Sequence, residues 1–297
     1  MISQVWKWPH ITKGVLTWLP PLDAWRRTHI STGGTDNARY CYSVWLRHLV
    51  TLEGCGFCIN GARVAELGPG DSVGTGLAAL LTGAGHYTGL DLMPSTRKAN
   101  LNEIFEELVR LFKNKEAIPG DNEFPRIRPR LRSYEFPEHM IDWQGINDRV
   151  ERLRADIKDG IQNSHILTYK APWISISDIP RYSCDLIFSQ AVLEYATPLA
   201  DLYRATYLWL KPGQYASHVF DLSAHYLSPY WNGHWAYYDI EWRLAQGRRE
   251  TFLNREPLSK HIACAQEFGL RRNAPAFWWA AAERPRNDHR VEQPTRL

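Results

Sequence analysis

The stretch from Ala62 to Met93 carries acids and glycines at positions that suit nucleotide binding. An apolar run ends at Glu66, and a turn containing Gly68 and Gly70 follows it. A small-residue helix and a second apolar run come next, and the second run ends at Asp91. Glycine lets the backbone approach a ligand because it has no Cβ, and the helix begins with unpaired N–H groups. Asp91 lies about 20 residues after the turn, the spacing at which an acid accepts hydrogen bonds from a ribose.

The glycine pattern discriminates between two kinds of nucleotide. Val73 stands where a dinucleotide-binding G-x-G-x-x-G has its third glycine, so a nicotinamide cofactor is disfavoured. The alternative to any nucleotide site is an ordinary strand–helix–strand turn in which Asp91 is a solvated acid.

A second group of polar residues follows a later apolar run, which we expect to be a strand over 214–222. Asp221 and His225 lie where this strand ends, His218 lies within it, and His234 is nearby. A histidine oriented by an aspartate can act as a general base. Strand ends also carry polar residues simply to turn the chain. The spacing matches no metal site that we would assign, so we expect no metal.

Apolar segments with strand-like and helix-like periods alternate along most of the chain. The expected strands are 62–67, 86–92, 166–170, 183–190 and 214–222, and the expected helices are 38–52, 76–81, 95–113, 151–161, 198–210 and 259–269. Such alternation predicts an α/β fold with a parallel sheet and right-handed crossovers.

Several short motifs, in this order, resemble those of the class I S-adenosylmethionine-dependent methyltransferases. The segment 66–70 resembles their motif I, 89–91 their second motif, 184–194 their motif IV, and 210–213 the turn before strand five. The resemblance covers residues 60–93 and 165–270. It implies a doubly wound, mostly parallel sheet of the seven-stranded, Rossmann-like type. The motifs are most similar to those of bacterial enzymes of glycan and polysaccharide biosynthesis.

The resemblance implies S-adenosylmethionine as the cofactor and assigns residues to it. Around its methionine and ribose would lie Glu66, Gly68, Pro69, Gly70 and Asp91. Against its adenine and sulfonium would lie Leu92, Met93, Pro172, Trp173, Ser189 and Gln190. The segment 171–173 lacks the aspartate that is common at the adenine edge. The implied activity is methyl transfer to an oxygen of a small-molecule or glycan acceptor, with His225, Asp221 and His218 as the catalytic candidates.

We divide the chain into a cap, a catalytic domain and a tail. Residues 1–58 are aromatic and contain basic residues, and we expect a helical cap whose prolines prevent one long helix. Contact with a membrane surface is the alternative for this segment. Residues 59–280 would form the methyltransferase domain, with an insertion at about 114–160 that we interpret as a lid or acceptor-binding subdomain. Residues 281–297 have few apolar side chains, which predicts a flexible tail.

The insertion contains Arg126, Arg128, Arg130 and Arg132 in alternation with apolar or proline residues. In an extended chain these side chains would share one face. They could then bind phosphate or carboxylate, or they could protect a solvated edge strand from pairing with another chain.

The bulk composition is that of a globular protein with an ordinary share of charged residues. The 297 residues carry a formal charge of +3, which is too small to indicate nucleic acid by itself. The five cysteines form no disulfide framework, so we expect a reducing, cytoplasmic compartment. The C-x-x-C at Cys55 and Cys58 leaves a metal or redox role open as a minor alternative. We see no signal peptide and no membrane-spanning run.

Two other functions compete with small-molecule methylation. One is RNA methylation, although Ser189-Gln190-Ala191-Val192 replaces the Asp/Asn-Pro-Pro-aromatic signature of amino-group methylation. The other is a scaffold or regulatory subunit that keeps the fold and the cofactor without catalysis. No oligomeric state is predicted.

Overall fold

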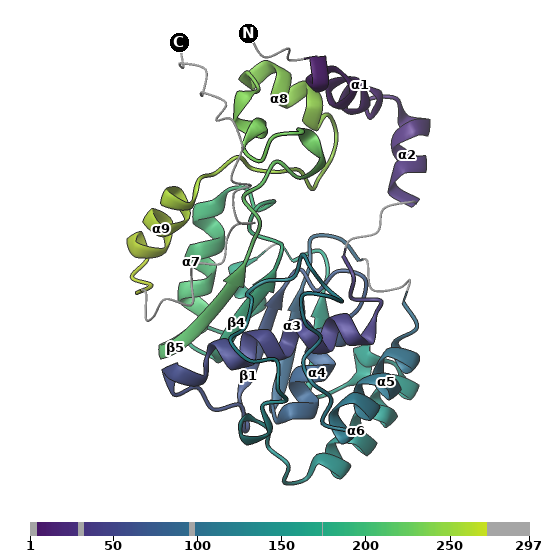
Figure 1. Ribbon diagram of the computed structural model, residues 1–297, viewed down its shortest axis with the longest axis vertical. Helices are drawn as coiled ribbons and strands as arrows, with labels where there is room; N and C mark the ends of the chain where they lie inside the picture. Colours follow the sequence, from purple (N-terminus) through teal and green to yellow (C-terminus); the bar gives the residue numbers. More distant parts are fainter. Residues whose placement is uncertain (1–4, 29–32, 95–98, 174, 272–297) are drawn as a thin grey trace.

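The computed structural model describes residues 5–28, 33–94, 99–173 and 175–271 (Figure 1). Its strands are β1 Arg63–Leu67, β2 His86–Leu90, β3 Leu167–Lys170, β4 Cys184–Gln190 and β5 Leu210–Val219. Its helices are α1 Trp8–Leu16, α2 Pro20–Thr28, α3 Ala38–Thr51, α4 Gly74–Thr82, α5 Leu101–Lys113, α6 Ile146–Asp159, α7 Leu199–Trp209, α8 Asp239–Gln246 and α9 Leu258–Glu267. Residues 95–98, which the sequence predicts to open a helix with α5, lie outside the described part.

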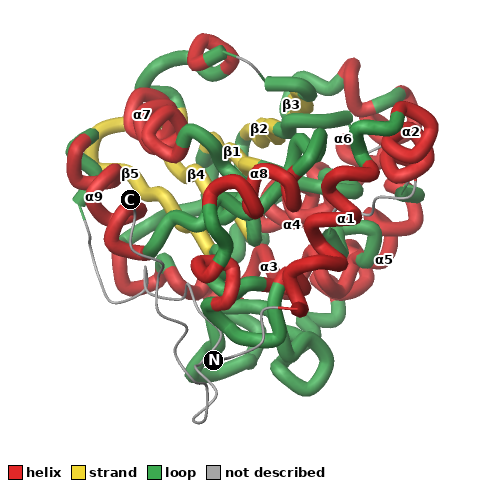
Figure 2. The backbone as a smooth tube through the Cα atoms, turned by 90° about the horizontal axis from the view of Figure 1, so that it is seen from above, coloured by secondary structure: helices red, strands yellow, loops and turns green. Residues whose placement is uncertain are grey.

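The strands form one parallel sheet in the order β3-β2-β1-β4-β5, as Figure 2 shows from above. The predicted parallel α/β sheet is confirmed. The described residues contain five of the seven strands that the resemblance implies. The remaining two would follow residue 270, and residues 272–297 lie outside the described part. The chain reverses its winding direction between β1 and β4, which makes their carboxyl ends a topological switch point.

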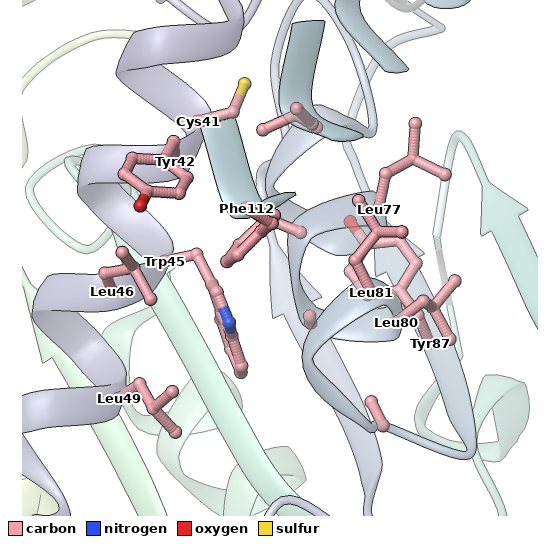
Figure 3. Close-up of a cluster of buried hydrophobic side chains, with 14 of the residues drawn as sticks. Cys41, Tyr42, Trp45, Leu46, Leu49, Leu77, Leu80, Leu81, Tyr87 and Phe112 are labelled. Carbon is pink, nitrogen blue, oxygen red and sulfur yellow. The ribbon is translucent and has the colours of Figure 1, made fainter. Parts of the chain in front are cut away.

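One face of the sheet is covered by α3, α4, α5 and α6, which share a single core (Figure 3). Asn37 caps α3 by accepting the N–H of Tyr40. Behind this cap, Tyr42 packs edge-on against Phe112 of α5 at 4.8 Å between ring centroids. Trp45 reaches the sheet, where its ring lies 5.6 Å from Phe188 of β4. These large rings fix α3 against the sheet, and they thereby position the loop that precedes α3.

The opposite face is covered by α7 and α9, with a second core around Trp209 and Cys264. The β5 strand begins earlier than the sequence predicts, because residues 210–213 belong to it rather than to a turn before it. An irregularity in the pairing between Cys184 and Leu186 of β4 accommodates this segment.

The insertion packs within the helical layer that α3, α4 and α5 form on this face of the sheet. Val150 and Leu153 bury α6 against α4 and α5, and Ile118 and Ile141 join the same core. The arginine-rich segment is not a strand, so the edge-strand interpretation is wrong. Its carbonyl at Pro129 instead accepts a 2.5 Å hydrogen bond from the buried guanidinium of Arg47.

The N-terminal segment and the segment after β5 meet in a third core, which joins α1 to α8. Figure 1 shows α1, α2 and α8 at the end of the molecule opposite α6. Prolines at the start of α1 and α2 divide the N-terminal segment into two helices, as the sequence predicts. Lys7 is buried and donates to the carbonyl of Ala236 at 2.5 Å and to Glu241 at 2.7 Å. No helix within the described ranges is long and apolar enough to cross a bilayer.

Candidate functional site

The carboxyl ends of β1 and β4 approach each other closely at the glycine turn. Gly68 has φ +66°, and a Cβ there would lie 2.6 Å from Cγ2 of Val192, which follows β4. A side chain at position 68 would therefore clash with the neighbouring loop and would strain the backbone. The turn lies at the carboxyl ends of β1 and β4, the switch point at which open α/β sheets bind ligands.

Asp91 leaves the carboxyl end of β2 and is held beside this glycine turn. Its Oδ2 accepts the N–H of Gly70 at 3.3 Å, and its Oδ1 accepts the N–H of Leu92 at 2.7 Å. Its carbonyl accepts the N–H of Trp173 at 2.9 Å, which brings the segment after β3 to the same edge. The structure therefore brings together Asp91, the glycine turn and the proposed adenine edge. Leu92 is about half exposed, and Met93 donates weakly to Asp91 at 3.4 Å.

The loop before α3 closes the other side of the glycine turn. Thr35 donates its hydroxyl to the carbonyl of Pro69 at 2.9 Å and accepts the N–H of Ser72 at 3.0 Å. Ser72 in turn donates to the carbonyl of Thr35. These reciprocal bonds order the glycine turn without a ligand, because they hold both Pro69 and Ser72 of the turn to Thr35.

Glu66 lies directly under the turn and is almost completely buried. Burial raises the pKa of this carboxyl to about 8, and the 2.6 Å hydrogen bond from the hydroxyl of Tyr87 opposes part of that effect. Tyr87 reaches Glu66 because Gly76 of α4 leaves room for its ring: a Cβ at position 76 would lie 2.2 Å from the ring. A mostly protonated acid near pH 7 can ionise when a cation approaches it.

Ser189 and Gln190 end β4, and Gln190 is partly buried, with an Oε1 that has no hydrogen-bond partner among the described residues. Ser189 is fully buried and lies 2.9 Å from Nδ1 of His218 on β5. His218 faces Tyr203 of α7, and burial followed by the nearby His48 and His261 lowers its pKa to about 3. It is therefore neutral at physiological pH. Within the described residues, no contact joins His218 to Asp221 or His225.

Asp221 and His225 do lie together, after the end of β5. Nε2 of His225 is 3.6 Å from Oδ2 of Asp221, and its Nδ1 is 3.1 Å from the hydroxyl of Tyr195. His225 holds φ +48° at the start of a short 3-10 helix, His225–Leu227. His234 is near this pair. Burial, followed by the charges of Arg255 and His225, lowers its pKa to about 4, and Asp221 opposes part of this effect. The 3.6 Å separation is longer than a hydrogen bond, and Nε2 of His225 has no hydrogen-bond partner among the described residues. Such separations can shorten on substrate binding.

Glu194 is the main site residue that the sequence reasoning did not assign. Its side chain is almost completely buried, its Oε1 accepts the N–H of Asp221 at 3.4 Å, and its Oε2 has no hydrogen-bond partner among the described residues. Burial raises its pKa to about 8. The available signal was an acid in the otherwise apolar run 191–195, which follows directly on a strand.

The cysteines and the other acids suggest no metal centre. Cys55 and Cys58 are free thiols, and the structure, over the residues it describes, holds no group of three or more side chains arranged to bind a metal ion. We therefore assign no role to the C-x-x-C spacing.

Comparison with solved structures finds distant likenesses to methyltransferases. The first is to phosphoethanolamine N-methyltransferase 2 of Haemonchus contortus in complex with S-adenosylmethionine, with 15% identity and a TM-score of 0.38. That match covers 76% of this chain but only 36% of the other, so this chain spans about a third of that length. An S-adenosylmethionine-dependent methyltransferase of Mesorhizobium loti matches with 15% identity, a TM-score of 0.37, and coverage of 71% and 75%.

An arsenic(III) S-adenosylmethionine methyltransferase of Chlamydomonas reinhardtii also matches, at 14% identity and a TM-score of 0.34, over 71% of this chain and 52% of that one. No protein-family model matches the sequence, and no curated protein matches it. At these identities and TM-scores, the likenesses assign neither a family nor an activity to this chain.

Proposed function

We propose that this chain is an S-adenosylmethionine-dependent methyltransferase that methylates an oxygen of a small-molecule or glycan-like acceptor. The observation that supports it best is the hydrogen bond between Oδ2 of Asp91 and the N–H of Gly70. It places a carboxylate and a glycine turn side by side at the switch point of a parallel sheet. This is the combination that a nucleoside needs: an acid for its ribose hydroxyls, and close backbone for the rest.

The residues around the crevice fit this cofactor in charge as well as in shape. Glu66 is a buried acid that can ionise beside a positively charged group, and Gly68 lets the turn lie against Val192 without a clash. Trp173 donates its backbone N–H to Asp91, and its ring packs edge-on against Trp209 of the second core at 5.5 Å between centroids.

The cofactor, when bound, supplies a methyl group on a sulfonium, which is already a good leaving group. The protein's main task is then alignment, which can contribute around 7–11 kcal/mol. The Thr35 loop and the bonds of Asp91 hold the crevice in one geometry for this purpose. A hydroxyl acceptor must also lose a proton. We propose His225 as the base that takes it at Nδ1, where the acceptor hydroxyl would replace that of Tyr195, with Asp221 beside the opposite ring nitrogen.

Calorimetry of the full chain with S-adenosylmethionine and S-adenosylhomocysteine tests the cofactor assignment. We expect wild type to bind both, and Asp91→Ala to bind about 10–100-fold more weakly, because hydrogen bonds to a charged group contribute roughly 1.5–3 kcal/mol. Asp159→Ala, at the exposed end of α6, is the matched control and should bind as wild type does. Equal binding by all three proteins would contradict the role of Asp91.

A panel of acceptors separates an enzyme from a cofactor-binding scaffold. Methyl transfer to a hydroxyl compound would support the proposal. Cofactor binding without transfer to any acceptor would favour the scaffold, and RNA binding that weakens strongly with salt would favour RNA methylation.

A further inference from the structure

The exposed large apolar side chains of this protein are concentrated at one end of the molecule. Within the described residues, most of them lie on the N-terminal helices and on the segment that contains α8. They are Val5, Trp8, Val15, Leu16, Trp18, Leu19, Leu22 and Trp25 in the first segment, and Tyr226, Tyr238, Ile240 and Leu244 in the second. We call this set the aromatic end. A concentration of exposed apolar side chains marks an interaction site more often than scattered ones do.

The charge of the chain is concentrated in the same place. Residues 1–28 contain four basic residues, Lys7, Lys13, Arg26 and Arg27, and one acid, Asp23. Their formal charge of +3 equals that of the whole chain, so the remaining residues are neutral in sum. Residues 1–28 therefore carry a net positive formal charge, within which Lys7 is buried against Glu241 and Arg26 is paired with Asp23.

Cations from three segments also approach one another there. Burial and the positive charges of Lys13 on α1 and Arg249 after α8 lower the pKa of His10. Burial and, to a smaller extent, the positive charge of Arg26 on α2 lower the pKa of Arg249. Tyr226 lies beside them, with its ring 6.2 Å from that of His10. Like charges brought together in this way are stabilised by an anionic surface.

The aromatic end is firmly attached to the fold. A Cβ at Gly14 of α1 would lie 2.0 Å from the carbonyl of Leu244 in α8, so the two backbones are in direct contact. Lys7 is buried against Ala236 and Glu241 beneath this contact. On these packed helices, Trp8 of α1 and Ile240 of α8 are each 65% exposed.

We propose that the aromatic end docks on the surface of an anionic lipid bilayer. Tryptophan is enriched at membrane interfaces, where its ring is buried and its N–H stays hydrated. Short helices that combine such rings with Lys and Arg lie in the interface and gain from anionic lipid. Tyr226, which belongs to this end, directly follows His225, so docking places the acceptor side of the candidate site at the bilayer surface.

Vesicle flotation of the full chain tests the proposal with phosphatidylcholine vesicles, with and without phosphatidylglycerol. We expect wild type to float with the anionic vesicles and to be released by high salt. Trp8→Ala/Trp18→Ala should lower the partition coefficient by about tenfold or more, because each ring buries about 150–250 Å². Lys13→Glu should lower it roughly fivefold or more.

Two matched control variants change an exposed ring and an exposed charge outside the aromatic end. Tyr207→Ala on α7 removes an exposed ring elsewhere, and Lys158→Glu on α6 reverses an exposed charge elsewhere; both should float as wild type does. Thermal unfolding confirms that each variant is folded. Flotation that the Trp8 and Trp18 changes leave intact would overturn the proposal. A second outcome would also overturn it: wild type does not float, light scattering shows that it is a dimer, and the double variant is a monomer. The aromatic end would then bind a second copy of the chain.

Discussion

At the scale of single residues, two buried acids distinguish this site from an ordinary sheet edge. Glu66 lies near the end of β1, and Glu194 lies shortly after β4, so both lie near the switch point. Burial raises the pKa of each to about 8. Ionising a buried carboxyl has a large free-energy cost, and a fold retains such groups most readily where a cation or a proton transfer needs them.

Glu194 should make stability depend on pH. Its pKa is higher in the folded state than in the unfolded state, so the folded state binds more protons between about pH 4.5 and 8. The stability it contributes is fully present below the lower value and is lost as pH rises through the upper one. Glu194→Gln removes this loss, so its melting temperature should gain on wild type as pH rises from 5 to 9. Parallel melting curves for the two proteins would contradict the raised pKa.

His225 should matter for turnover and not for cofactor affinity. Its φ of +48° suits Asn better than most residues, so His225→Asn removes the imidazole with little backbone strain. We expect turnover to fall about 100-fold or more, within the range that a general base contributes, with unchanged binding of S-adenosylhomocysteine. Turnover that stays within a factor of two of wild type would remove His225 from the mechanism.

The sequence predicted the glycine turn and Asp91 because each follows a short strand, and the two are separated by a recognisable spacing. It could not predict which polar side chains meet across strands. Ser189 and His218 are 29 positions apart and bond inside the fold, and Tyr195 meets His225 across 30 positions. Such pairs depend on sheet register and loop paths, which leave no periodic signal in the chain.

At the scale of elements, the close contact between α4 and β2 holds Tyr87 on Glu66. Gly76→Ala adds a Cβ that would lie 2.2 Å from the ring of Tyr87. Alanine favours a helix by about 1 kcal/mol, but overpacking of a filled core typically costs about 1–3 kcal/mol or more. A 2.2 Å contact is far inside van der Waals distance, so we expect net destabilisation in denaturant unfolding.

Gly54→Ala is the matched control, because a Cβ there meets nothing within 4 Å. Its free energy of unfolding should stay within about 0.5 kcal/mol of wild type. If Gly76→Ala behaved in the same way, α4 would not pack on Tyr87 as described.

Regular elements with a clear period were predictable, and the insertion was not. The helices over 101–113 and 199–209 have long apolar faces, and both were expected. The segment 114–145 contains only one short helix, and its buried residues are fixed by contacts with α3, such as the bonds from Arg47 to Pro119 and Pro129. Those contacts depend on tertiary packing, which local propensity does not report.

At the scale of the whole molecule, the N-terminal helices and the segment after β5 pack together beside the proposed acceptor side of the site. The segment after β5 carries His225 and continues into α8, and α1 packs on α8 from the other end of the sequence. Gly14→Val should separate them, because a side chain at position 14 would overlap the carbonyls of Leu244 and Ala245. Hydrogen exchange should then increase in α1 and α8 while the sheet stays protected. Unchanged protection of α8 would show that the two helices are not coupled.

We propose that a sulfonium nucleoside lies across the carboxyl ends of β1 and β4 and that Asp91 accepts hydrogen bonds from its ribose. A crystal structure with S-adenosylhomocysteine tests it most directly. We predict ribose hydroxyls at about 2.5–3.0 Å from the carboxylate of Asp91, and the adenine beside Trp173. A crevice filled by the protein's own side chains, or a ligand bound elsewhere with Asp91 untouched, would contradict it.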